Sequence, residues 1–148
     1  ERWEADCLQL GCDWVSILVG INDVHRFVDK RGDISPAKYR EVYGRLLRRL
    51  GEAGQAGVIL WEPFYLVTPQ ARIPKVADLL GEYIAAVHSL AGEYSSRVEG
   101  VIRTQDLFVQ ACRRRWAEFW ALDGVHPTPA GAHLMACEFL RFVGWKLE

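Results

Sequence analysis

Three short apolar runs, separated by longer segments with helical periodicity, limit the folds that this chain can adopt. The runs are residues 14–19, 57–61 and 98–103. The first two are almost continuously apolar, which is typical of strands buried on both faces of a parallel sheet. Because strands and helices alternate along the chain, we expect a parallel sheet with helices on both faces.

The predicted helices are marked by capping residues and apolar stripes. The clearest spans residues 35–51, because Ser35 can cap it, Pro36 suits its first position, and its apolar side chains recur every three or four residues. Similar signals predict further helices at residues 1–10, 74–94 and 104–115 and from Thr128 towards Trp145, with polar turns or loops at residues 24–34, 64–73 and 116–127.

Length and composition indicate one domain over residues 1–148 and argue against several kinds of partner. Of the residues, 50% are hydrophobic and 25% charged, and the net charge of −1 creates no field that favours nucleic acid or an anionic membrane. No apolar run approaches the ~20 residues that cross a bilayer. No secretory signal is recognisable, so we expect a cytoplasmic protein unless a signal segment has been lost.

The cysteines do not predict a metal site. Cys7, Cys12, Cys112 and Cys137 lack the spacing of zinc ligands and have no paired histidines nearby. We therefore expect four free thiols, no metal and no cofactor.

Gly20 ends the first apolar run and is followed by two small polar side chains, Asn22 and Asp23. In open α/β sheets ligands bind at the carboxyl edge of the strands, so both are candidate site residues, and His25 is near enough in sequence to line the site. An Asn amide that points into such a site can donate a hydrogen bond to an oxyanion. The alternative is structural, because Asn and Asp are common where a chain turns out of a sheet.

The candidate general base is His126, which follows Asp123 by three residues. An aspartate that accepts the Nδ1–H of an imidazole holds the correct tautomer and stabilises the imidazolium as it forms. Gly124 lets the chain bend, and Pro127 holds His126 in an extended conformation. The alternative is a plain turn before the helix that Thr128 caps.

No nucleophile is evident in the sequence. Ser16 lies in the middle of a predicted strand, where its side chain should be buried, and Ser35 is predicted to cap a helix. The remaining serines fall at or near a helix end, and Cys12 lies at the opposite edge of the sheet. None of them occupies the strand-to-helix elbow where an exposed nucleophile is expected.

The two polar stretches together resemble the SGNH (GDSL-type) hydrolases. Residues 20–23, Gly-Ile-Asn-Asp, look like the third sequence block of that family, and residues 123–127, Asp-Gly-Val-His-Pro, look like its fifth block. The resemblance implies that Asn22, with Gly20 beside it, supplies the oxyanion hole. It also implies that Asp123 and His126 belong to a Ser-His-Asp triad.

The resemblance covers essentially the whole chain and implies an α/β fold. That fold is a three-layer α/β/α sandwich with a flavodoxin-like parallel sheet in the strand order 2-1-3-4-5. Residues 15–19 and 62–64 also look typical of bacterial members. The family's Gly-Asp-Ser block and its second block are not found in residues 1–13. We therefore expect an N-terminally incomplete domain without the first two strands and with its nucleophile unknown.

Absence of those strands leaves the run from Trp14 to Val19 as an unpaired edge. This run is apolar and uncharged, so an uncovered edge there is an aggregation hazard. We expect the same strand of a second copy to cover it across a two-fold axis, which makes a homodimer.

The resemblance implies a carboxylic ester hydrolase for small acyl or acetyl esters. The alternative is a truncated, catalytically inactive remnant that acts as a structural or binding dimer. A Gly-Asp-Ser motif upstream in the reading frame would favour the first. A flavodoxin-like binding domain also fits the strand order, but no phosphate-binding glycine loop supports it.

Overall fold

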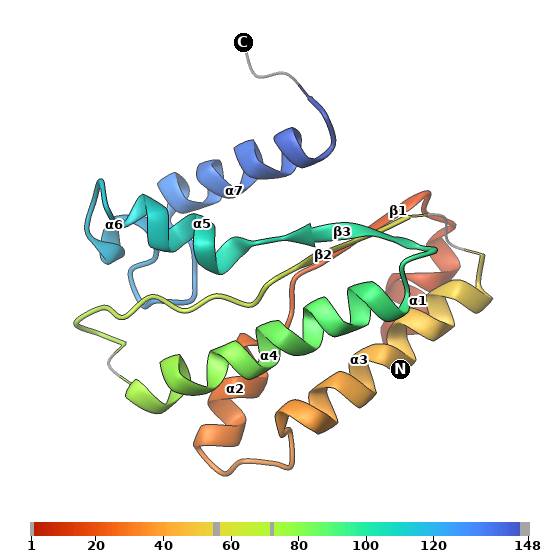
Figure 1. The fold of residues 1–148 in the computed structure, drawn as a ribbon, viewed down its shortest axis with the longest axis horizontal. Helices are drawn as coiled ribbons and strands as arrows, with labels where there is room; N and C mark the ends of the chain where they lie inside the picture. Colours follow the sequence, from red (N-terminus) through yellow and green to blue (C-terminus); the bar gives the residue numbers. More distant parts are fainter. Residues whose placement is uncertain (1, 55–56, 72, 146–148) are drawn as a thin grey trace.

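A parallel sheet forms the centre of the structure, and helices cover both of its faces (Figure 1). The computed structural model describes residues 2–54, 57–71 and 73–145. The sheet has the order β1-β2-β3, with β1 at Trp14–Ile17, β2 at Gly57–Trp61 and β3 at Val98–Ile102. The helices are α1 (Arg2–Asp6), the short 3-10 helix η1 (Leu8–Leu10), α2 (Ile21–Val28), α3 (Pro36–Glu52), α4 (Pro74–Glu93), α5 (Thr104–Ala111), α6 (Ala117–Trp120) and α7 (Pro129–Phe142).

The expected three-layer α/β/α architecture is confirmed. Figure 1 shows α2, α3 and α4 on one side of the sheet and α5 and α7 on the other. The predicted caps also form, since the Ser35 side chain accepts the N–H of Lys38 and the Thr128 side chain accepts that of Gly131. Each cap is followed by a proline in the first turn, as the sequence indicated.

The main hydrophobic core lies between the sheet and α2, α3 and α4. Tyr43 and Tyr83 are almost completely buried there, together with Leu60 of β2. On the opposite face, Ile59 and Trp61 of β2 pack against α7, where Phe139 stacks on Trp61. All five residues of β2 are buried, so the prediction of a strand covered on both faces is confirmed for β2.

The same prediction is wrong for the first strand. β1 ends at Ile17 and lies at the edge of the sheet, where Trp14 remains 55% exposed and Leu18 and Val19 are also exposed. Ser16, expected to be buried, is exposed, and its Oγ accepts a 2.7 Å hydrogen bond from Trp61 Nε1. The physical reason is that α7 packs on β2 and β3, so the face of β1 that carries Trp14 and Ser16 borders an open hollow.

Two predicted loops contain helices. Residues 21–28 form α2, whose Val24 is fully buried in the main core, and residues 117–120 form the single turn α6. Tertiary packing of a short apolar stripe stabilises α2, although the polar composition of residues 24–34 predicted turns. Other helices are shorter than expected: α5 ends at Ala111, α7 ends at Phe142, and the helix expected over residues 1–10 divides, within residues 2–10, into α1 and η1, while residue 1 lies outside the described residues. Among the helices of the described ranges, none is long and apolar enough to cross a bilayer.

Shortening a core residue of β2 should destabilise the whole domain. Leu60→Ala removes a side chain that is 0% exposed, so we expect the free energy of unfolding to fall by about 2–5 kcal/mol. Leu10→Ala is the matched control, because Leu10 is 63% exposed and its truncation should change stability by less than about 0.5 kcal/mol. Urea unfolding followed by circular dichroism measures both, and equal effects would contradict the assignment of Leu60 to the core.

Candidate functional site

Both polar stretches singled out in the sequence contact residues 63–66, the segment that follows β2. At Gly20, an added Cβ would lie 3.2 Å from Cβ of Pro63 and 3.0 Å from the Tyr39 hydroxyl. At the other stretch, the Leu66 N–H donates to the Gly124 carbonyl at 2.9 Å. The segment therefore lies in contact with both halves of the predicted site at the carboxyl end of the sheet.

Glycine is required at residues 20 and 124 by conformation and by space. Gly20 has φ +127°, directly before α2, and Gly124 has φ +83°, in the left-handed region that favours glycine. A Cβ on Gly124 would collide with the Leu66 carbonyl. Residues 63–66 can approach the backbone this closely at both positions only because glycine has no side chain.

Helix α2 exposes Asn22 in its first turn, beside Gly20. His25 follows on the next turn, where its ring packs edge-on against Tyr65 with the centroids 5.8 Å apart. Its Nε2 is buried, and no hydrogen-bond partner for it occurs in the described part of the chain. The amide of Asn22 is thus accessible at the strand edge, and His25 contacts the segment after β2.

Asp23 lies elsewhere. It lines a largely apolar hollow with Tyr39 and Tyr43 of α3, away from the contacts made by Asp123 and His126. Burial raises the pKa of Asp23, and the nearby Arg26 partly offsets this effect. The structure therefore places Asp23 between α2 and α3, apart from the second polar stretch.

Asp123 and His126 form a hydrogen-bonded pair. His126 Nδ1 lies 2.6 Å from Asp123 Oδ2, while the backbone N–H groups of His126 and Val125 donate to Oδ1 at 2.9 and 3.1 Å. Burial acts to raise the pKa of Asp123, but these hydrogen bonds and the nearby imidazole outweigh it and lower that pKa to about 2. The carboxylate is therefore ionised at neutral pH and acts as an acceptor, which puts the proton of a neutral imidazole on Nδ1.

The other imidazole nitrogen is available to a substrate or a nucleophile. The His126 side chain is 84% exposed, and no group in the described ranges hydrogen bonds to its Nε2. The loop that carries it is held on both sides, because Ala121 forms a β-bridge with Pro127 and the Thr128 N–H donates to the Trp120 carbonyl at 2.8 Å. A fixed imidazole with an open Nε2 can accept a proton as a general base.

The serines and cysteines of the described ranges do not reach this nitrogen. Ser16 is bound by Trp61, Ser35 caps α3, and Ser89 is contacted by Arg40. All four cysteines are free thiols, as expected, and the described residues contain no group of three His, Cys, Asp or Glu side chains that could hold a metal ion. The nucleophile predicted as unknown is therefore also not identified in the described structure.

Sequence reasoning missed a buried carboxylate next to the site and the side chain that it pairs with. Glu62 is only 3% exposed and lies 2.6 Å from Nε2 of His88, whose side chain is partly exposed on α4. Gln105 of α5 hydrogen bonds to both the N–H and the carbonyl of Tyr65. A signal was present, because a carboxylate that directly follows a buried strand needs a partner, but the partner lies 26 residues away and only the fold brings it near.

Comparison with known proteins identifies the family of the chain. Residues 1–134 match the model of the GDSL-like lipase/acylhydrolase family. The chain is 33% identical over 149 residues to an acetylxylan esterase of Geobacillus stearothermophilus, and the alignment covers 98% of this chain and 65% of that enzyme. The chain therefore spans just under two thirds of the length of this relative.

Solved structures show the same fold. A protein described as a GDSL-like lipase from Parabacteroides merdae superposes with a TM-score of 0.89 at 29% identity, covering 98% of this chain and 66% of that one. The Geobacillus acetylxylan esterase Axe2 superposes with a TM-score of 0.81 at 30% identity, covering 98% and 65%. The family match extends over most of the sequence, and we conclude that the chain belongs to the GDSL-like lipase/acylhydrolase family.

Proposed function

We propose that this protein is a carboxylic ester hydrolase that acts on small acyl esters, with acetyl esters as the preferred class. The single observation that carries the proposal is the Asp123–His126 pair, whose 2.6 Å hydrogen bond leaves Nε2 open to solvent. The family match supports the reaction type. Acetylated xylo-oligosaccharides are the proposed natural substrates, because a relative of 30% identity is an acetyl-xylooligosaccharide esterase.

In the proposed mechanism His126 is the general base and then the general acid. Its Nε2 removes the proton from an attacking hydroxyl group, either a serine beyond the described contacts or a water molecule. Asp123 stabilises the imidazolium that results. Asn22, beside Gly20, donates its amide N–H to the oxyanion of the tetrahedral intermediate. Collapse of the intermediate breaks the ester bond, and the imidazolium returns the proton to the departing alcohol. Attack by water releases the carboxylic acid directly. After attack by a serine the acyl group is bound to its oxygen, and a water molecule activated by His126 then hydrolyses this second ester, freeing the acid and the serine.

The Geobacillus esterase supports the assignment of the pair. Alanine substitutions of one serine, one aspartate and one histidine are described as catalytic mutants of that enzyme, and its histidine follows its aspartate by three positions. His126 follows Asp123 by the same interval. We therefore carry the roles of the aspartate and histidine over to this pair.

Removing the base should abolish hydrolysis. We expect His126→Ala to lower kcat for 4-nitrophenyl acetate by about 10²- to 10⁴-fold, because proton transfer in the transition state is lost. His133→Ala is the matched control: His133 is also an exposed histidine, but it lies on α7 and contacts Cys137. Initial rates at neutral pH distinguish the two variants, and equal rates would contradict the role of His126.

Removing the proposed oxyanion donor should reduce kcat with little change in KM. We expect Asn22→Ala to lower kcat by about 10²- to 10³-fold, as loss of one such donor does in other acyl-transfer enzymes. Asn22 is exposed, so the free energy of unfolding should change by less than about 0.5 kcal/mol. Arg26→Ala, an exposed change on the same helix, controls for effects on α2. A large rise in KM at constant kcat would assign Asn22 to ground-state binding instead.

A second candidate function is a structural or binding homodimer, and the exposed edge of β1 favours it. β1 pairs with β2 alone among the described strands, and Leu18 and Val19 just beyond it are 40% and 43% exposed. Unpaired edges of this kind associate with other strands. We propose that the edge from Trp14 to Val19 pairs with its counterpart in a second copy of the chain.

A lysine on the proposed interface should separate the copies. Light scattering at micromolar concentration should give twice the 16.8 kDa chain mass for the unchanged protein and a single chain mass for Leu18→Lys, because a buried lysine opposes edge pairing. Leu10→Lys, an equivalent change at an exposed leucine of η1, should leave the dimer intact. A monomer before any substitution would contradict the dimer.

A further inference from the structure

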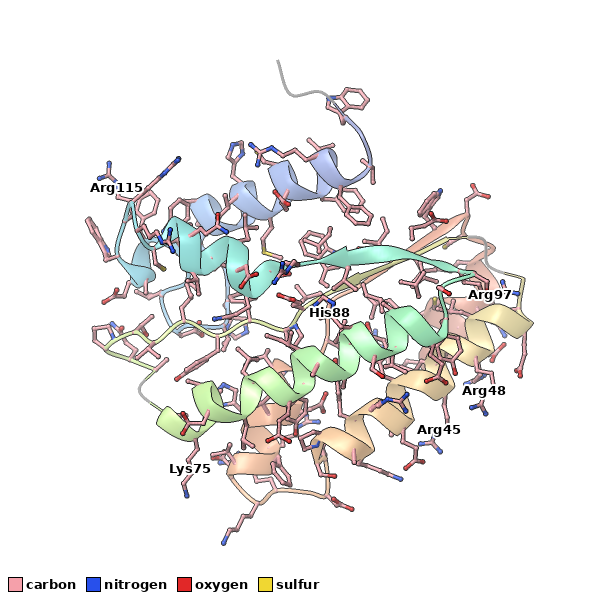
Figure 2. The ribbon with its side chains drawn as sticks, viewed as in Figure 1. Arg45, Arg48, Lys75, His88, Arg97 and Arg115 are labelled. Carbon is pink, nitrogen blue, oxygen red and sulfur yellow. The ribbon has the colours of Figure 1, made fainter. Side chains whose placement is uncertain are left out.

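Glu62 carries a carboxylate that is buried at the carboxyl end of the central strand. Its side chain is 4% exposed, with Oε1 2.6 Å from His88 Nε2 and 4.0 Å from Arg103 Nε. Figure 2 shows His88 projecting from α4 towards the sheet, and Arg103 directly follows β3. Because a buried carboxylate without a partner is strongly unfavourable, the place of Glu62 depends on these two side chains.

This anchoring occurs where the backbone ladder of the sheet stops. The Glu62 N–H donates to the Ile102 carbonyl at 3.0 Å, and the next residue, Pro63, has no N–H to donate to a neighbouring strand. Beyond Pro63, the backbone of Tyr65 is bound by the side chain of Gln105, which accepts the Tyr65 N–H at 2.9 Å and donates to the Tyr65 carbonyl at 3.3 Å. Hydrogen bonds from side chains therefore hold residues 62–65, where the backbone pairing of the strands has ended.

The anchored segment contacts both halves of the candidate site. Pro63 packs against Gly20, which leads into Asn22, and the Leu66 N–H donates to the carbonyl of Gly124, next to Asp123. A displacement of the segment would change the distance between the Asn22 amide and the His126 imidazole. Displacements of about 1 Å at a catalytic site can cost ~10²-fold in rate.

We propose that Glu62, held by His88 and Arg103, is a positioning residue that fixes residues 63–66 and through them the relative placement of Asn22 and the Asp123–His126 pair. The proposal rests on the proposed hydrolase function for its kinetic consequence. Its structural consequence, a fixed environment for the His126 ring, does not require hydrolysis. The partners of the Glu62 carboxylate in the described structure are His88 and Arg103, not Asn22 or His126, so Glu62 acts through residues 63–66.

Three variants test the anchor. Glu62→Gln removes the negative charge but keeps the size and an oxygen acceptor, and His88→Ala leaves the carboxylate without its 2.6 Å partner. Glu93→Gln is the matched control, because Glu93 forms a 2.6 Å ion pair with Arg40 that is half exposed and joins α4 to α3. His88 is itself partly exposed, so its truncation leaves the core intact and provides a second variant if Glu62→Gln fails to fold.

The first readout is the ring ¹⁵N spectrum of histidine-labelled protein. The spectrum of His126→Ala identifies the His126 signals. We expect Glu62→Gln and His88→Ala to shift the His126 signals and Glu93→Gln to leave them unchanged. Unchanged His126 signals in a folded Glu62→Gln protein would overturn the proposal. This readout decides the question even if no ester is hydrolysed, so failure of the anchor and failure of the proposed function can be told apart.

The second readout is ester hydrolysis. We expect Glu62→Gln and His88→Ala to lower kcat by about 10- to 100-fold with KM changed less than about threefold, because placement of the reacting groups is affected more than binding. The double variant Glu62→Gln/His126→Ala should be no slower than His126→Ala alone, since residues that act as a unit are not additive. Independent losses in the double variant, or equal rates for Glu62→Gln and Glu93→Gln, would overturn the proposal.

Discussion

The structure depends on the burial of β2 between two layers of helices. This strand is paired on both edges and buried at all five residues, so it connects the core under α3 and α4 with the core under α7. Its direction determines where residues 63–66 leave the sheet. Both halves of the candidate site contact that exit segment, and the position of the site therefore follows from the packing of the central strand.

Close approach at two glycines connects the two halves of the site through residues 63–66. Gly20 and Gly124 both have positive φ and both lie against residues 63–66, where a side chain would meet Pro63 or the Leu66 carbonyl. The candidate site residues are neighbours of these glycines, with Asn22 on a helix and His126 on a loop held by a β-bridge. Rigid backbone elements thus present exposed side chains, which suits a site that must bind a substrate and still hold its own geometry.

The Asp123 carboxylate shows how local hydrogen bonding sets the ionisation state of a candidate site residue. Three donors from residues 125 and 126 converge on it and lower its pKa to about 2. Spacing alone makes this possible, since the aspartate and histidine are three residues apart in one turn. Glu62 is the opposite case, because its main partner, His88, is contributed by a distant helix.

Much of this arrangement follows from the sequence alone. Alternating apolar runs and capped amphipathic helices predicted the parallel sheet and its layers, and the interval between Asp123 and His126 predicted their pairing, because strand burial, helix capping and short-range hydrogen bonds depend on neighbours in the chain. Tertiary structure decided the rest: that one face of β1 borders an open hollow, that Asn22 lies in the first turn of a helix, that Asp23 lies beside α3, and that His88 reaches Glu62. These features depend on which surfaces meet across the fold, and no local pattern specifies contacts between segments far apart in the sequence.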